Sequence, residues 1–252
     1  MTKLKKPLLF TLCLLPIAAL GSWSTAKISL ADMDEKTLEA AVQQAGSLEI
    51  IMLASVLQSV IIAVICGFFG YIISGKIGLL RQFGLSGKET VITMTAGAVC
   101  GFVLSTDAFV FVHFIPLLED VYKASGSFDA HVWIASVLYG GVIEEVMLRL
   151  FLMSLLSLIG RKLFCKKEDT VPERIFIVSN VIASLLFAAG HLPATITALG
   201  QLTPLVVFRC FLMNGSFGIV YGRLYRKYGI QYAMIAHIVT HIVSRTIWII
   251  IF

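Results

Sequence analysis

Apolar residues form long runs along the whole chain, separated by short polar segments. A run of about 18 or more apolar residues is long enough to cross a bilayer as an α-helix. Runs of this kind lie at 49–74, 91–115, 131–160, 175–195, 203–221 and 230–252. The pattern predicts an all-α polytopic membrane protein.

A shorter apolar run at 7–23 follows three lysines and precedes Ser24-Thr25-Ala26. A basic start, a short apolar core and small residues after it are typical of a secretory signal, although an uncleaved first helix has the same features. We expect an uncleaved anchor. The chain then has about seven transmembrane helices, or six if the first segment is a cleaved signal.

The polar segments alternate in charge along the chain. The basic segments are the N-terminus, 75–90, 161–174 and 222–229, and the acidic segments are 24–48 and 116–130. Because basic loops are retained in the cytoplasm, we expect the N-terminus to be cytoplasmic and the protein to be integral to a bacterial plasma membrane. Within the first acidic segment, 34–46 has the composition of a short surface helix.

These features divide the chain into three parts. Residues 1–48 are expected to form an N-terminal signal-anchor helix followed by an acidic external linker. Residues 49–130 would supply two accessory transmembrane helices. Residues 131–252 would form a four-helix core, and this part holds most of the ionisable residues that lie within apolar runs.

Composition supports this interpretation and excludes some functions. Of the 252 residues, 58% are hydrophobic and 14% are charged, whereas a soluble domain is about a quarter charged. We therefore expect membrane lipid around the protein. The net charge of +5 lies in clusters between apolar runs, which orients a membrane protein and does not indicate nucleic-acid binding. The five cysteines have no ligand spacing, and we expect no disulfides.

Three ionisable residues lie in the middle of the run 131–160, namely Glu144, Glu145 and Arg149. A charged side chain at the bilayer centre costs at least about 2.5–3.5 kcal/mol. Glu145 and Arg149 are four residues apart, so that on a helix they share a face and can pair. Glu144 has no local partner, which makes it the strongest candidate for a functional carboxylate.

Three histidines lie in other apolar runs at compatible depth. His237 and His241 are four residues apart and would face one way, and Phe187 would pack beside His191 in the same manner. Since each polar group is costly alone, a joint site is the best explanation for the histidines and glutamates.

Other polar residues in the apolar runs have simpler explanations. For Arg209 and Arg245 we expect structural pairing, because neither belongs to a spacing motif. Asp107 and His113 lie near the end of the run 91–115 and are expected to form an interfacial polar cap.

Three separated motifs match one family pattern. They are EExxxR at 144–149, FxxxH at 187–191 and HxxxH at 237–241. Together they resemble the CPBP (Abi) family of intramembrane proteases, which includes CAAX prenyl endopeptidases and bacteriocin-processing and self-immunity proteins. The resemblance covers about 131–252. The third motif departs from the family pattern, because His241 stands where the family has Asn or Asp.

The resemblance implies an intramembrane active-site cavity and a role for each motif residue. Glu144 would be the general base that activates water, and His191 would help to hold that water. Glu145 and Arg149 would order the first glutamate. His237 and His241 would stabilise the oxyanion, provided that an imidazole N–H of His241 points at the substrate.

Involvement of a metal is open at this stage. Glu144, His191, His237 and His241 could supply ligands to zinc. Four protein ligands would close the site, however, whereas catalytic zinc keeps one position for water. The metal-free mechanism, with no certain cofactor, is the preferred hypothesis, and a zinc-dependent protease is the alternative.

Three functions remain in competition. The first is an intramembrane endopeptidase acting on a CAAX-like, pheromone or bacteriocin-type peptide. The second is a non-catalytic membrane immunity or scaffold protein that retains the motif. The third is an ion-coupled transporter, since such proteins also bury Glu, His and Arg. Transporters usually show paired broken helices in two repeated halves, and no such repeat is present in the sequence.

Overall fold

The computed structural model describes residues 2–166, 168 and 170–252, and in this part of the chain all regular structure is helical. Six helical segments are long and apolar enough to cross a membrane. They are Leu4–Ala31, Leu48–Lys76, Gly87–His113, Glu173–Leu199, Pro204–Tyr228 and Ile230–Ile251. The predicted all-α polytopic membrane fold is confirmed.

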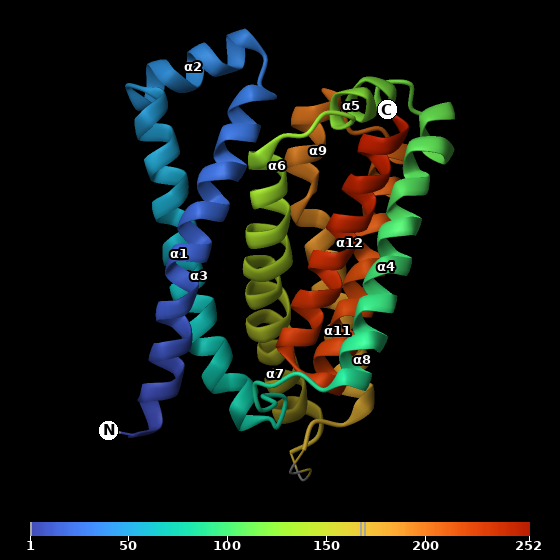
Figure 1. Cartoon of the computed structure of the whole chain (residues 1–252). Coiled ribbons are helices and arrows are strands. Elements are labelled where there is room, and N and C mark those ends of the chain that lie inside the picture. The colour runs from blue at the N-terminus through green and yellow to red at the C-terminus, as the bar shows by residue number, and fades with distance from the viewer. Residues whose placement is uncertain (1, 167, 169) are drawn as a thin grey trace.

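The predicted span at 131–160 is also helical, although its middle is not a regular α-helix. It begins as α6 (Ala130–Ile134), continues through the π-helical segments η2 (Ala135–Glu144) and η3 (Val146–Met153), and ends as α7 (Ser154–Phe164). Figure 1 shows it running alongside the other long helices from one end of the bundle to the other. With the six apolar helices it gives the seven long segments expected from the sequence.

The first segment forms one continuous helix, α1 (Thr2–Ala31), which packs against α3 (Leu48–Lys76) and η2. The small residues at 24–26 lie inside this helix, and the Ser24 side chain is fully buried. After α1, the surface helix α2 (Glu35–Ala45) begins where the sequence predicted it, because the Asp34 carboxylate accepts a hydrogen bond of 3.0 Å from the Thr37 N–H.

The polar segments lie at two ends of the bundle, as their alternating charge predicted. The N-terminus, α7 and the turn before α12 (Ile230–Ile251) lie at one end, which carries the basic segments. At the other end lie α2, α5 (Leu118–Ser125), α9 (Leu192–Leu199) and the C-terminus (Figure 1). Which end faces the cytoplasm stays a prediction.

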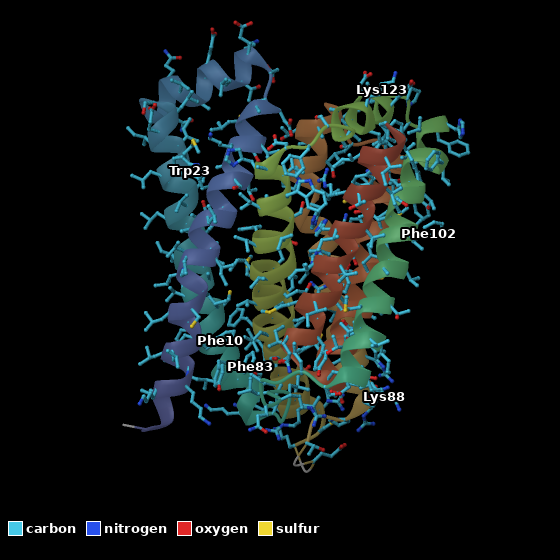
Figure 2. All side chains as sticks on the ribbon, in the orientation of Figure 1. Phe10, Trp23, Phe83, Lys88, Phe102 and Lys123 are labelled. Atoms are coloured by element: carbon cyan, nitrogen blue, oxygen red, sulfur yellow. The ribbon has the colours of Figure 1, made fainter. Side chains whose placement is uncertain are left out.

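Helix α12 lies at the centre of the bundle, between α4 (Gly87–Val110) and η2. Two glycines permit its close approach to α4. A Cβ atom at Gly97 would lie 2.4 Å from the Ala236 carbonyl oxygen, and one at Gly101 would lie 2.6 Å from the Thr240 carbonyl oxygen. Large apolar side chains such as Phe102 point away from the bundle (Figure 2), as expected of a surface that meets lipid.

Candidate active site

Glu145 and Arg149 form the buried pair that their spacing predicted. Arg149 Nη1 lies 3.0 Å from Glu145 Oε1, and both side chains are almost completely buried. The guanidinium also lies over two aromatic rings, 4.7 Å from the Phe187 centroid and 5.5 Å from the Tyr221 centroid. Arg149 also packs against Gly218 of α11 (Ser216–Tyr228). A Cβ atom at position 218 would lie 3.0 Å from Arg149 Nη2, so the glycine leaves room for the guanidinium.

The pair is held mainly by charge. Arg149 Nη1, Arg149 Nη2 and Glu145 Oε2 have no well-directed hydrogen bond within the described residues, although Nη1 is within ion-pair distance of Oε1. We regard the contact as a true ion pair, because a buried cation and a buried anion at 3.0 Å attract each other strongly whatever the angle of the N–H bond.

His237 joins the pair from α12. Its Nδ1 lies 2.9 Å from Glu145 Oε1, and its Nε2 lies 3.1 Å from His241 Nε2. A carboxylate only accepts hydrogen bonds, so His237 donates from Nδ1. In neutral His237 the Nε2 atom is then an acceptor, and His241 donates to it. The two imidazoles are thus joined by a hydrogen bond between their Nε2 atoms.

Aromatic rings fix the orientation of His237. The Tyr221 ring stacks on it at a centroid distance of 4.6 Å and an interplanar angle of 20°, and the Phe187 ring meets it edge-on at 5.9 Å. The Tyr221 hydroxyl donates to Thr240 Oγ1 at 2.8 Å. Sequence reasoning missed Tyr221, because its position within GIVYGR shows no pattern that indicates a site.

His191 lies at the junction between α8 (Glu173–Gly190) and α9. Its Nδ1 lies 2.9 Å from the Phe187 carbonyl oxygen and donates to it, which leaves Nε2 as an acceptor in the neutral ring. Phe187 packs edge-on against His191 at 4.6 Å, as the sequence predicted. Since Phe187 also contacts His237, it links the two histidines.

Glu144 is placed differently from its neighbour. Its side chain is half-buried and makes no hydrogen bond or ion pair with any described residue. It is close enough to Tyr139 to interact electrostatically with that side chain. One turn before Glu144, Gly140 packs against His241. A Cβ atom added at Gly140 would lie 3.0 Å from His241 Nε2. The Glu144 turn therefore adjoins the histidine helix, while its carboxylate remains free of direct partners among the described residues.

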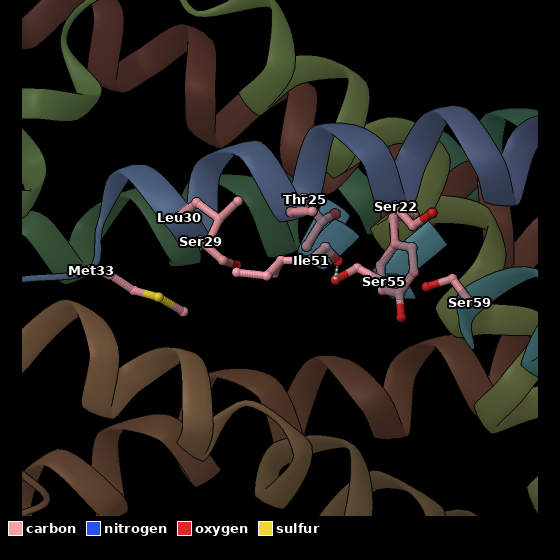
Figure 3. Close-up of a pocket in the computed structure, with 10 residues that line it drawn as sticks. Ser22, Thr25, Ser29, Leu30, Met33, Ile51, Ser55 and Ser59 are labelled. Carbon is pink, nitrogen blue, oxygen red and sulfur yellow. Dashed lines mark hydrogen bonds between the residues drawn. The ribbon is translucent and has the colours of Figure 1, made fainter. Parts of the chain in front are cut away.

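A small pocket whose polar lining groups are hydroxyls, which we call the serine pocket, reaches Tyr139 from the side of α1 and α3. Its volume is about 170 Å³, and its polar lining consists of Ser22, Thr25, Ser29, Ser55, Ser59 and Tyr139. Figure 3 shows Ser22 and Thr25 near Ser55 and Ser59. Ser22, Thr25 and Ser55 donate to carbonyls of their own helices, so their oxygens can still accept hydrogen bonds from water.

The proposed zinc ligands are not gathered into a metal site. Within the described part of the chain, no group of three or more His, Cys, Asp or Glu side chains is arranged to hold a metal ion. His237 and His241 are hydrogen-bonded to each other, whereas Glu144 forms no hydrogen bond or ion pair with either imidazole. The metal-free mechanism stays a prediction, with zinc dependence as its alternative.

A second buried charge cluster corrects one expectation. Asp107 is fully buried rather than interfacial, and Arg209 Nε lies 2.9 Å from both of its carboxylate oxygens. The Tyr122 hydroxyl, 3.0 Å from Arg209 Nη2, also donates to Asp107. The structural pairing expected for Arg209 is confirmed. The prediction for Asp107 was wrong because one of its partners, Arg209, is distant in the sequence. His113 is exposed, as expected.

Comparison with known proteins gives one match. Residues 126–243 match the family model described as type II CAAX prenyl endopeptidase Rce1-like. The matched region contains all six predicted site residues, from Glu144 to His241. No curated protein and no solved structure matches the chain.

Proposed function

The chain belongs, through residues 126–243, to the Rce1-like family of type II CAAX prenyl endopeptidases, and we propose that it hydrolyses a peptide bond within the membrane using water activated by Glu144. One observation carries this proposal. Arg149, Glu145, His237 and His241 contact one another in sequence, and the neighbouring Glu144 has no hydrogen-bond or ion-pair partner among the described residues. The expected partners are membrane lipid and a peptide or protein substrate, with a CAAX-like, pheromone or bacteriocin-type peptide as candidates.

The two glutamates would have separate tasks. Glu145 Oε1 is already engaged by Arg149 and His237, so that Glu145 is a poor proton acceptor and orders the site. The Glu144 oxygens have no such partners in the described residues. Different environments for neighbouring carboxylates are the usual way to obtain a base and a structural anion from the same residue type.

Water is needed at Glu144, and the serine pocket, which ends at Tyr139, would be its route. Hydroxyl groups that already donate to the backbone can accept from water, and Tyr139 connects the pocket to the surroundings of Glu144. His191 Nε2, left as an acceptor by the bond from Nδ1 to Phe187, is available to hold a water molecule. Peptide hydrolysis in a bilayer requires such a protected polar site.

The reaction would proceed in two proton transfers. Glu144 takes a proton from water as the water oxygen bonds to the peptide carbonyl carbon, and the carbonyl oxygen becomes an oxyanion. An N–H of His237 or His241 would donate to that oxyanion. Glu144 then returns the proton to the peptide nitrogen as the C–N bond breaks. Because the two Nε2 atoms are hydrogen-bonded to each other, the histidine pair would have to reorient when the substrate arrives.

The contact between the two histidines also favours a second candidate. His241 replaces the family's Asn or Asp and engages His237 directly, which could leave no N–H for an oxyanion. The chain would then be a non-catalytic immunity or scaffold protein that retains the motif.

Peptide cleavage by purified protein separates the two candidates. The full-length protein in lipid nanodiscs would be incubated with a peptide library, and products would be identified by mass spectrometry. An endopeptidase produces defined internal cuts. Intact peptides throughout, with a folded protein, would favour the non-catalytic candidate.

A further inference from the structure

A cavity of about 510 Å³ lies at the end of the bundle that carries α5, α9 and the C-terminus. Its walls come from five helices, among them α5 (Val121), α6 (Trp133), α9 (Ala198) and α12 (Arg245, Ile249). We call it the Arg245 cavity, because this guanidinium is the cation in its lining.

The structural pairing expected for Arg245 is wrong, because within the described residues it forms no ion pair, unlike the other arginines of the helical interior. Arg149 pairs with Glu145, and Arg209 pairs with Asp107. The Arg245 guanidinium carbon lies 5.2 Å from the Trp248 ring centroid. Its Nε is buried without a hydrogen-bond acceptor, and no described carboxylate forms an ion pair with it.

An unpaired guanidinium in this position indicates that an anion binds there. Arginine stays protonated in proteins, so that it cannot avoid the cost of burial by losing its charge. A buried charge is expensive unless it is paired and hydrogen-bonded. The cavity provides the space in which an external anion could become that partner.

Arg245 relates the cavity to the candidate active site. Arg245 follows His241 by four residues on α12, so the two side chains share a face, about 6 Å apart along the helix axis. They are close enough to interact electrostatically. His237 lies one further turn along the same face.

The rim of the cavity has the opposite charge. Asp32, Asp120 and Asp129 contribute to the lining, and all three are exposed. Solvent and salt screen such exposed charges, and none of them pairs with Arg245. A ligand would thus meet acidic groups at the mouth and a cation one helical turn from His241.

We propose that the Arg245 cavity binds a carboxylate of the peptide substrate, with Arg245 as its receptor. The inference rests on the proposed protease function. An extended chain spans at most about 3.6 Å per residue, and the turns of α12 place Arg245 about 6–12 Å from His241 and His237. The carboxylate therefore lies within about four residues of the scissile bond. It is either the C-terminal carboxylate or an Asp or Glu side chain.

Matched peptides test this assignment. A peptide that the wild-type protein cleaves would be compared with its C-terminal amide, and with versions in which Asp or Glu near the cut is replaced by Asn or Gln. Loss of the recognised carboxylate should lower kcat/KM about tenfold to hundredfold, the size expected for a charge-assisted hydrogen bond. The variant that loses activity identifies the source of the carboxylate.

Arg245→Gln should cleave the acid and the neutral peptide with equal efficiency, and Arg245→Lys should restore part of the preference because it keeps the charge. Arg174→Gln, the same substitution at an exposed arginine outside the cavity, is the control and should keep the wild-type preference. A preference that persists in Arg245→Gln, or a wild-type protein without any preference, would overturn the assignment. Thermal unfolding of each variant excludes misfolding as the cause.

A binding measurement tests the Arg245 cavity without requiring that the protein cleave peptides. Native mass spectrometry would compare a library of N-acetylated tetrapeptides as free acids, the same library as amides, and an amide library containing Asp and Glu. Preferential binding of an acidic library that is lost in Arg245→Gln supports the cavity even if no peptide is cleaved. Equal binding of all libraries by the wild-type protein refutes it.

Discussion

At the scale of single residues, Glu144 and Glu145 are neighbours with very different surroundings. Glu145 is fully buried and contacts Arg149 and His237, whereas Glu144 is half-buried and has no direct partner among the described residues. Spacing alone predicted the Glu145–Arg149 pair, because residues four apart on a helix share a face. The contact of His237 with Glu145 joins residues 92 positions apart, and local periodicity carries no information about it.

Tyr139 offers a test of the route by which water reaches Glu144. Tyr139→Phe keeps the ring and removes the hydroxyl that connects the serine pocket to the glutamate. We expect kcat to fall about fivefold with little change in KM, since one neutral hydrogen bond contributes about 1 kcal/mol. Steady-state cleavage kinetics measure the effect. Tyr71→Phe, which alters a tyrosine packed against Phe10, should behave like the wild type, and an equal loss in both variants would contradict the route.

His241 distinguishes a metal-free from a zinc-dependent reaction. If the histidine donates to the oxyanion, His241→Asn should keep at least about a tenth of the cleavage activity, because an amide N–H can make the same bond. If zinc is required, the variant should lose metal and activity together, as Asn is a poor zinc ligand. Metal content by plasma mass spectrometry, measured with cleavage before and after chelation, decides between them. One zinc per active wild-type protein, removed by chelator with loss of cleavage, would refute the metal-free hypothesis.

At the scale of elements, hydropathy predicted the long helices well but not their irregular turns. The predicted spans 49–74 and 230–252 correspond to α3 (Leu48–Lys76) and α12 (Ile230–Ile251). The π-helical turns of η2 and η3 were not predicted, since an apolar run shows its length but not whether its hydrogen bonds connect i with i+4 or i+5. Such turns often occur at functional sites, and here they flank Glu145.

The contact between α4 and α12 should be sensitive to small changes in volume. Gly97→Ala would place a methyl group against the Ala236 carbonyl oxygen, one residue before His237. Overpacking of this kind costs about 1–3 kcal/mol, and displacement of α12 should also lower cleavage by the histidine site. Thermal unfolding in detergent and kcat/KM measure the two effects. Gly87→Ala on the same helix is the control, because nothing lies within 4 Å of its added Cβ; equal stability of the two variants would contradict the packing argument.

At the scale of the whole molecule, charge separates the two ends of the bundle. Lys88 and Lys123 lie at opposite ends (Figure 2). Because basic loops are retained in the cytoplasm, a cysteine at Lys88 or Lys166 should react with an impermeant thiol reagent only after the cells are permeabilised. A cysteine at Lys123 should react in intact cells. The native cysteines, of which Cys13 is exposed, would first be replaced by serine or alanine. Labelling of Lys88→Cys from outside would reverse the orientation.

The assembly of the site from three regions of the chain could be predicted only in outline. The motif residues and their similar depth predicted a joint site of Glu144, His191, His237 and His241, which stays a prediction. The structure joins His237 and His241 to Glu145 and Arg149. The rotation of each side chain within its helix could not be predicted. It depends on packing partners such as Tyr221 and Gly218, which show no signal in a single sequence.

The division of work between the two glutamates is the central claim, and paired amide substitutions test it most directly. Peptide cleavage and thermal unfolding would be measured for Glu144→Gln and Glu145→Gln, with Glu119→Gln as an exposed control. Glu144→Gln should abolish cleavage and unfold like the wild type, because an amide cannot accept the proton of water. Glu145→Gln should lose about 3–5 kcal/mol of stability, because it leaves Arg149 buried without its anion. Cleavage at the wild-type rate by folded Glu144→Gln would contradict the account.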